Sequence, residues 1–361
     1  MSTIPEPTRR RVLQALGAGS VLLAGCSSSS PEATPEQQTT STPQTPSANA
    51  AQSTDVDRVA ADPTDIPDPI DRDTSETIEV EMTTHEQVAE IEPGVTYEYM
   101  TFDGQIPGPM IRVRRGDTVE LTITNDESNV MPHNIDLHAV RGPGGGAEDS
   151  TVAPGETATF QFKATYPGAF IYHCAVPNMD YHISSGMFGM ILVEPEDGLP
   201  EVDHEFYFGQ QELYTTGDTG EKGHHDFDMD AMAAEEPTYV LINGEKTAIT
   251  PDKYGSPTVN VGEDARVYFV TGGPNLDSSF HPIGSVWDEV YPQGSIASDP
   301  HRFVQTTPVK PGSCAITTLH AEVPGNIKLV DHALSRVARK GALAVISREG
   351  EENTEVFDPD P

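Results

Sequence analysis

The sequence predicts an all-β protein made of two tandem β-sandwich domains. Four segments alternate apolar and polar side chains with a period of two, which is typical of half-buried strands, and Gly, Pro or Asn residues bound them. These segments are 77–82, 97–102, 118–124 and 157–162. No long amphipathic helical pattern competes with them. Short strands separated by turn residues in this way are typical of an antiparallel sandwich.

A repeat indicates that the chain holds two copies of this sandwich. Pro154-Gly155 stands thirteen residues before Pro167-Gly168, and Pro311-Gly312 stands thirteen residues before Pro324-Gly325. Self-similarity of this kind is the mark of a duplicated structural unit. The second copy has no cysteine after its second Pro-Gly pair. We therefore expect the two copies to share a fold but not a thiolate metal site.

The predicted organisation has five parts. Residues 1–25 form a signal segment, and residues 26–75 are a disordered tether rich in Ser, Thr and Pro, because they hold almost no large apolar side chains. The two sandwiches follow over residues 76–198 and 201–349. Residues 350–361 form an acidic tail.

The N-terminal segment predicts export. Arg9-Arg10-Arg11 precede the apolar run 12–24, which is too short to span a bilayer but suits a signal peptide. Paired arginines indicate the route taken by proteins that cross already folded. The sequence Leu23-Ala24-Gly25-Cys26 resembles a lipoprotein processing site, which predicts a lipid anchor on Cys26 at the outer face of the cytoplasmic membrane. An ordinary signal peptide with an incidental cysteine is the alternative.

The charge balance excludes one class of function and suggests a habitat. The chain has 57 acidic and 21 basic residues, which leave a formal net charge of −36. So acidic a protein does not bind nucleic acid through its phosphates. A heavily solvated acidic surface is expected in a high-salt habitat, where salt screens the repulsion between surface charges. We interpret the chain as a halophile's protein.

The run from Phe170 to Met187 holds three soft metal ligands at loop spacing. Cys174, His182 and Met187 offer a thiolate, an imidazole and a thioether within fourteen residues. With one more histidine, this set is the His₂Cys site with a weak axial Met that suits a copper ion carrying one electron. A lone Cys or Met is more often a packing residue, so the prediction depends on an upstream partner, His133.

Side-chain parity predicts a second metal site on the other face of the same strand. Successive residues of a strand point to opposite faces, so His173 cannot easily share a metal with Cys174. Upstream, His133 has odd parity, whereas Asp136 and His138 have even parity. His133 therefore complements Cys174, and His138 complements His173.

The remaining cysteine and a histidine pair have simpler interpretations. Cys314 lies inside a predicted strand, and we expect it to be buried and inert. With Cys26 lipidated and Cys174 on a metal, the three cysteines leave no disulfide to form. The acidic segment 217–236 contains His224-His225, which could bind a stray metal, but we favour a mobile, solvated loop.

The ligand segments resemble those of copper-containing nitrite reductases. The resemblance covers approximately residues 80–350, and it implies two tandem cupredoxin-like Greek-key β-sandwich domains with a type 1 and a type 2 copper. The segments that carry it are Pro132-His133-Asn134-x-Asp136-x-His138, Tyr172-His173-Cys174 and His182-x4-Met187-x-Gly189. The implied ligands are His133, Cys174, His182 and Met187 for type 1 copper, and His138, His173 and His332 for type 2 copper.

The resemblance also implies an activity and partners. The activity is the one-electron, dissimilatory reduction of nitrite to nitric oxide in denitrification or in nitrate assimilation or respiration, with one copper of each type per subunit. Asp136 and His281 are implied to supply protons. His332 matches the family pattern loosely, and His320 and His301 remain alternatives. The implied partners are nitrite, a small electron-donor protein of the blue-copper or cytochrome type, and further copies in a homotrimer with the type 2 site at a subunit interface.

Two other functions fit part of this pattern. A two-domain multicopper oxidase would need about eight histidines, mostly in His-x-His pairs, to hold a three-copper cluster, and the sequence has no His-x-His pair. A cell-surface blue-copper electron carrier would need the type 1 ligands but would have no use for Asp136, His138 or His173. Counting the coppers per chain separates the carrier from the reductase.

Overall fold

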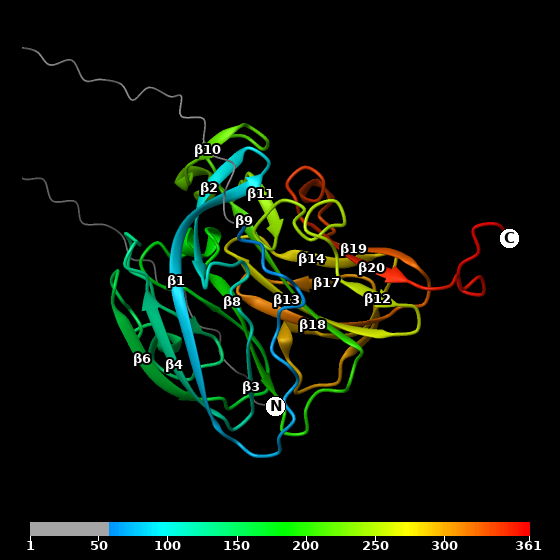
Figure 1. Cartoon of the computed structure of the whole chain (residues 1–361), viewed down its shortest axis with the longest axis horizontal. Coiled ribbons are helices and arrows are strands. Elements are labelled where there is room, and N and C mark those ends of the chain that lie inside the picture. The colour runs from blue at the N-terminus through cyan, green and yellow to red at the C-terminus, as the bar shows by residue number, and fades with distance from the viewer. Residues whose placement is uncertain (1–57) are drawn as a thin grey trace, which may run out of the picture. The chain divides into compact units, whose positions relative to one another are not determined.

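The computed structural model describes residues 58–361, and strands are the main regular secondary structure in this part of the chain (Figure 1). The predicted signal segment and Cys26 lie outside the described residues. Two β-sandwiches are present, which confirms the predicted fold class. The helical elements are short: α1 (Met179–Ser184), α2 (Met229–Ala233) and the 3₁₀ turns η1 (Pro143–Gly146), η2 (Pro292–Gly294) and η3 (Leu334–Arg336). Within residues 58–361, no helix is long and apolar enough to cross a membrane.

The first sandwich pairs a five-stranded sheet with a four-stranded sheet. The five-stranded sheet has the order β10-β2-β1-β4-β6, and the four-stranded sheet has the order β3-β8-β7-β5. The strands are β1 (Thr77–Glu92), β2 (Val95–Phe102), β3 (Ile111–Arg114), β4 (Thr118–Asn125), β5 (Asp136–Leu137), β6 (Thr157–Lys163), β7 (Gly168–His173), β8 (Phe188–Glu194) and β10 (Gly223–His225). Each of the four segments with period-two patterning lies inside one of these strands, namely β1, β2, β4 or β6.

The second sandwich has sheets of the order β11-β9-β13-β18-β15-β16 and β12-β20-β19-β14-β17. In Figure 1 these strands lie opposite the sheet that contains β1 and β4. Their bounds are β9 (His204–Leu213), β11 (Tyr239–Ile242), β12 (Thr258–Asn260), β13 (Asp264–Gly273), β14 (Ser278–Ile283), β15 (Trp287–Tyr291), β16 (His301–Val304), β17 (Thr307–Val309), β18 (Ser313–His320), β19 (Gly325–Asp331) and β20 (Leu343–Glu349).

The sheets are mixed, which corrects the expectation of purely antiparallel sandwiches. In the first sandwich β1 runs parallel to β4 and β3 runs parallel to β8. In the second, β9 runs parallel to β13 and β12 runs parallel to β20. Periodicity reports which face of a strand is buried but not the direction of its neighbour, so this feature is absent from the pattern of the sequence.

A shared apolar core joins the two sandwiches. It includes Ile171 and Phe188 from the first sandwich and Tyr207, Tyr268 and Cys314 from the second, each at most 2% exposed. Cys314 is buried as predicted, and burial raises the pKa of its thiol. The strand that precedes Cys174 is therefore held between its own sheet and the neighbouring sandwich.

Residues 58–75 correct the predicted boundary of the tether. Val59, Ala60 and Ala61 are buried; the Val59 carbonyl accepts the Ile106 N–H, and the Ala61 N–H donates to the Ile106 carbonyl. The buried carboxylate of Glu245 accepts the backbone N–H groups of Val59 and Ala60, each at 3.1 Å. This short apolar group thus finds both burial and hydrogen-bond partners in the second sandwich. The remainder of the predicted tether lies outside the described residues.

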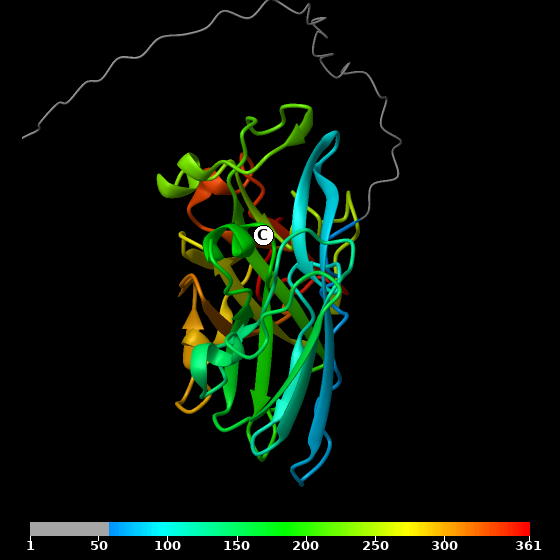
Figure 2. The ribbon, with the colours of Figure 1, turned by 90° about the vertical axis from the view of Figure 1, so that its left-hand side faces the viewer.

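The segment around His224-His225 also differs from the predicted mobile loop. Gly223–His225 forms β10, which pairs with β2 beside the tip of the β1–β2 hairpin (Figure 2). The His225 ring is 3% exposed and contacts the Glu221 carbonyl at 2.9 Å, while His224 Nδ1 lies 3.2 Å from Thr96 Oγ1. Both nitrogens of the buried His225 ring and Nδ1 of His224 thus have partners, which does not favour the stray metal site.

Candidate metal centres

Three predicted ligands of the first centre meet at the end of β7. Cys174 follows the strand directly, His182 lies on α1, and His133 lies before β5. The Cys174 Sγ atom is 3.9 Å from His133 Nδ1 and 3.6 Å from His182 Nδ1. All three side chains are fully buried. Their ligand atoms lie within 4.8 Å of one another, which is compact enough to hold one ion.

Local hydrogen bonds bring Met187 to the same place. The Cys174 N–H donates to the Met187 carbonyl at 3.1 Å, and the Met187 N–H donates to the His182 carbonyl at 3.0 Å. The Met187 side chain is fully buried. Asn178 adopts a left-handed conformation, with a φ of 65°, immediately before α1. This turn folds the chain so that residues 174, 182 and 187 return to one point.

The electrostatics of the first centre suit a metal ion. Burial raises the pKa of Cys174 to about 11, so without a cation the thiol keeps its proton. Burial, and then the neighbouring His133, lower the pKa of His182 to about 4. Burial also lowers the pKa of His133. The imidazoles are therefore neutral ligands, and a bound cation would offset the cost of a buried thiolate.

The second group comprises Asp136, His138 and His173. Asp136 is paired directly opposite His173 in the β5–β7 ladder, and the ligand atoms of the three residues lie within 4.8 Å of one another. His138 Nε2 is 3.1 Å from His173 Nε2. His173 Nδ1 lies 3.0 Å from the Cys174 carbonyl. Because a carbonyl only accepts, Nδ1 donates and His173 Nε2 keeps its lone pair for a metal.

Burial lowers the pKa of His138, and the nearby His173 lowers it further, while Asp136 opposes the shift. Two imidazoles that converge on one point are a natural part of a copper site. The residues present therefore fit copper at both groups. The two groups share the peptide bond between His173 and Cys174.

A glycine turn makes room for the Asp136 carboxylate. η1 consists of Pro143-Gly-Gly-Gly146, and Gly145 has a φ of +61°. A Cβ atom at Gly145 would lie 1.9 Å from Asp136 Oδ1 and 2.9 Å from its Cγ. Glycine is thus required at this position both for its conformation and for the close approach of the carboxylate.

The rings of His281 and His332 pack against each other, but neither residue belongs to the Cys174 group or to the His138 group. Their ring centroids are 5.0 Å apart, and His281 Nδ1 contacts the Gln305 carbonyl at 2.5 Å. Among residues 58–361, the metal-binding group with His138 and His173 contains neither of them. The turn at Gly312, in the second sandwich, lies next to His138. A Cβ atom added at Gly312 would be 3.7 Å from His138 Cε1.

The two alternatives to His332 lie elsewhere. His320 Nδ1 is 2.8 Å from Asp264 Oδ1, and the His320 N–H donates to Asp288. His301 is exposed at the start of β16. In the described part of the chain, the ring of His332 packs against His281, whereas the rings of His320 and His301 do not.

Sequence reasoning missed two residues that support the first centre. Asn134 Oδ1 accepts the Ala175 N–H at 2.6 Å and lies 3.7 Å from Cys174 Sγ. Glu86 Oε1 lies 3.0 Å from His133 Nε2, and the Glu86 side chain is only 6% exposed. A signal existed for Glu86, because it has the parity of Met82 and Thr84, which face inward on β1.

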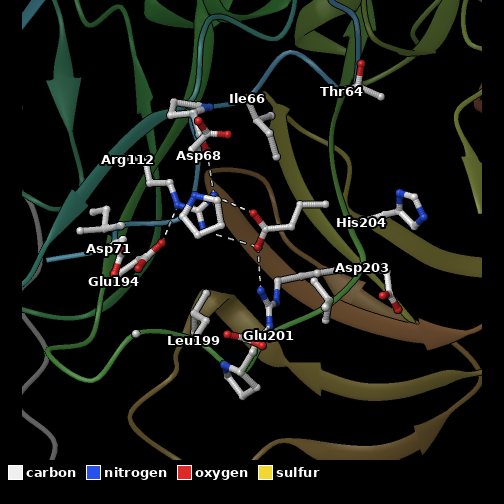
Figure 3. Close-up of a pocket in the computed structure, with 18 of the residues that line it drawn as sticks. Thr64, Ile66, Asp68, Asp71, Arg112, Glu194, Leu199, Glu201, Asp203 and His204 are labelled. Atoms are coloured by element: carbon white, nitrogen blue, oxygen red, sulfur yellow. Dashed lines mark hydrogen bonds and ion pairs between the residues drawn. The ribbon is translucent and has the colours of Figure 1, made fainter. Parts of the chain in front are cut away.

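A cavity of about 670 Å³ lies at the joint between the sandwiches, apart from both groups. Its floor holds Arg112, which pairs with Glu194 and with Glu205 (Figure 3). Arg266 also pairs with Glu205, at 2.6 Å. None of the predicted metal ligands lines this cavity. Its buried charges are paired with each other, and we interpret them as a clasp between the domains.

The fold and the two groups define a class of protein. A family model for multicopper oxidases matches residues 83–198. A solved multicopper oxidase is 25% identical with a TM-score of 0.65, over 81% of this chain and 98% of that one. Two β-sandwiches with a buried His–Cys–His group, and a second histidine group joined to it through one peptide bond, define a two-domain cupredoxin-type copper protein.

More similar relatives identify the family. The copper-containing nitrite reductase of Neisseria meningitidis serogroup B is 47% identical over 302 residues, which covers 84% of this chain and 76% of that protein. The solved copper nitrite reductase of Nitrosomonas europaea is 36% identical with a TM-score of 0.68, over 77% of this chain and 96% of that one. The chain belongs to the copper-containing nitrite reductase family.

Proposed function

We propose that this protein reduces nitrite to nitric oxide and water, a reaction that consumes one electron and two protons. The observation that carries the proposal is the juxtaposition of the two groups. Cys174 belongs to a buried group with His133 and His182, and the adjacent His173 belongs to a group with Asp136 and His138. The family assignment supports the same reaction.

The residues would act as follows. His133, Cys174, His182 and Met187 would hold a type 1 copper, and His138, His173 and His332 would hold a type 2 copper. When bound, these ions supply a one-electron relay and a Lewis-acid position for an anion. Asp136, whose carboxylate occupies the space left by the glycine turn, and His281 would deliver protons. The peptide bond between His173 and Cys174 provides the short path between the groups.

A second copy of the chain would complete the type 2 group. His332 is exposed and lies apart from His138 and His173 within one chain. Large apolar side chains are exposed on β14 and in the turn after it (Ile283 at 39% and Val286 at 44%), on η3 just after His332 (Leu334 at 59%) and on β16 (Phe303 at 75%). Such a surface suits contact with another protein surface. A head-to-tail contact that closes by rotation gives a ring, and we propose a homotrimer.

The cellular setting is part of the proposal. An exported, lipid-anchored enzyme in a salt-rich habitat agrees with the twin arginines, with Cys26 and with the net charge of −36. A small blue-copper protein or cytochrome would deliver electrons at the end of the molecule near His182. Exposed Val130, Met179 and Met229 there offer apolar contact area. Denitrification or nitrate respiration is the pathway class that this reaction serves.

Copper analysis combined with turnover tests the proposal. The purified holoprotein should bind two coppers per chain and release nitric oxide from nitrite with an artificial reductant. Cys174→Ala should lose the intense visible thiolate-to-copper absorption and turnover while it keeps copper at His138 and His173. One copper per chain and no nitric oxide would indicate an electron carrier, and oxygen consumption without nitric oxide would indicate an oxidase.

A further inference from the structure

The two imidazoles beside Cys174 differ in what holds their outer nitrogens. His133 Nε2 lies 3.0 Å from Glu86 Oε1. The Nε2 atom of His182 is equally buried but has no hydrogen-bond partner in the described part of the chain. One ring is therefore fixed by a carboxylate and the other by packing alone. Neither the spacing of the ligands nor the parity of the strands accounts for this asymmetry.

The contacts of Glu86 determine which nitrogen of His133 carries the proton. Glu86 Oε2 accepts the Val130 N–H at 3.1 Å, and Oε1 accepts the Met131 N–H at 2.9 Å. Both carboxylate oxygens are thus acceptors, so His133 Nε2 must be the donor to Oε1. Its Nδ1 atom then keeps the lone pair and faces Cys174 Sγ at 3.9 Å.

Glu86 is itself held rigidly. It lies on β1, its backbone N–H donates to Asn129 Oδ1 at 2.7 Å, and its side chain is only 6% exposed. The carboxylate cannot turn toward solvent without giving up the hydrogen bonds of Val130 and Met131. A negative charge therefore remains behind one ligand of the first centre, in a region that water does not screen.

We propose that Glu86 is a positioning residue that fixes the ring and tautomer of His133 and lowers the reduction potential of the copper held at Cys174. This inference rests on the proposed function. A carboxylate partner makes a ligating imidazole more basic. Its charge also stabilises Cu(II) more than Cu(I), because the oxidised ion carries one more positive charge. A lower potential at this centre favours passage of the electron to the second centre.

Substitution of Glu86 tests the proposal by potentiometry. Glu86→Gln keeps the shape of the side chain and removes its charge. The Cu(II)/Cu(I) ratio at a fixed applied potential should fall roughly tenfold, which is about 59 mV for one electron. Glu86→Ala should shift it at least as far. Glu81→Gln is the matched control, because Glu81 lies on the same strand and is exposed, and it should leave the potential unchanged.

The readout is the visible absorption of the thiolate-bound copper during a redox titration, with electron paramagnetic resonance of the oxidised form as a second measure of its geometry. Potentials of Glu86→Gln and Glu86→Ala equal to that of the parent protein would overturn the proposal, and Glu86→Gln alone decides if the alanine variant does not fold. Absence of the visible band from the parent protein would instead refute the copper site itself. The two failures are therefore distinct.

Discussion

His173 and Cys174 are neighbours in the chain, yet they belong to different metal groups because β7 ends between them. His173 is paired with Asp136 across the β5–β7 ladder, while Cys174 turns into the pocket formed by His133 and His182. The alternation of side chains along a strand separates the two residues. If the proposed function is right, a single peptide bond couples the chemistry at one group to electron storage at the other.

At the same scale, the proposed proton donors, Asp136 and His281, can be tested separately from the metal ligands. Asp136→Asn and His281→Ala should each lower turnover by roughly 10² to 10⁴, the range for losing a positioned acid or base. Both coppers should remain bound, because neither residue is a proposed ligand. Steady-state rates across a pH series, with copper content measured on the same samples, provide the check. Near-normal rates and an unchanged pH profile in both variants would remove the two residues from the mechanism.

At the scale of the element, η1 determines where the Asp136 carboxylate can lie. Gly145→Ala would place a methyl group 1.9 Å from Asp136 Oδ1, so the carboxylate must move. A displacement of about 1 Å at a catalytic group can cost about 10²-fold in rate, and we expect a loss of that order. Gly142→Ala is the control, since its φ is −158° and its nearest neighbour is Val140 Cγ1 at 3.6 Å. Equal rates for the two variants would show that η1 does not hold Asp136.

A second prediction at this scale concerns the clasp, the buried ion pairs of Arg112 and Arg266 with Glu194 and Glu205 at the joint between the domains. Arg112 is 1% exposed and pairs with Glu194 at 2.5 Å and Glu205 at 2.6 Å. Arg112→Met leaves the buried Glu194 carboxylate without its cation and Glu205 with Arg266 alone, and it should lower the free energy of unfolding by about 3–5 kcal/mol. Arg115→Met removes an exposed pair at 3.8 Å and should cost less than about 1 kcal/mol. Urea denaturation of both variants measures the difference, and similar losses would contradict the role of the clasp.

Most of the fold could be predicted from the sequence, but contacts between residues far apart in the chain could not. Period-two segments indicated strands, and the order of His133, Cys174 and His182 indicated a common site that the structure assembles. The burial of Val59 depends on Glu245, which is 186 residues away, and no local pattern reports such a contact. The contact between Glu86 and His133 spans 47 residues in the same way. Under the proposed function, the residue that completes the His138 group comes from a second chain, and no pattern within one sequence reports such a contact.

At the scale of the whole molecule, the proposal that two chains share the type 2 group predicts complementation. Chains with His138→Ala and chains with His332→Ala should each be inactive alone. Mixed trimers should regain part of the activity, because some interfaces then combine an intact His138 with an intact His332. Turnover of trimers reassembled from differently tagged chains measures this. If mixed trimers form but stay inactive, the ligands come from one chain or His332 is not a ligand.

Electron transfer from the Cys174 group to nitrite is tested most directly by anaerobic stopped-flow spectroscopy of the reduced holoprotein. Reduction bleaches the thiolate-to-copper band, and mixing with nitrite should restore it as nitric oxide appears. The restored band reports oxidation of the copper at Cys174, and the nitric oxide reports where the electron went. A band that stays bleached with nitrite but returns with oxygen would contradict the assignment of this protein as a nitrite reductase.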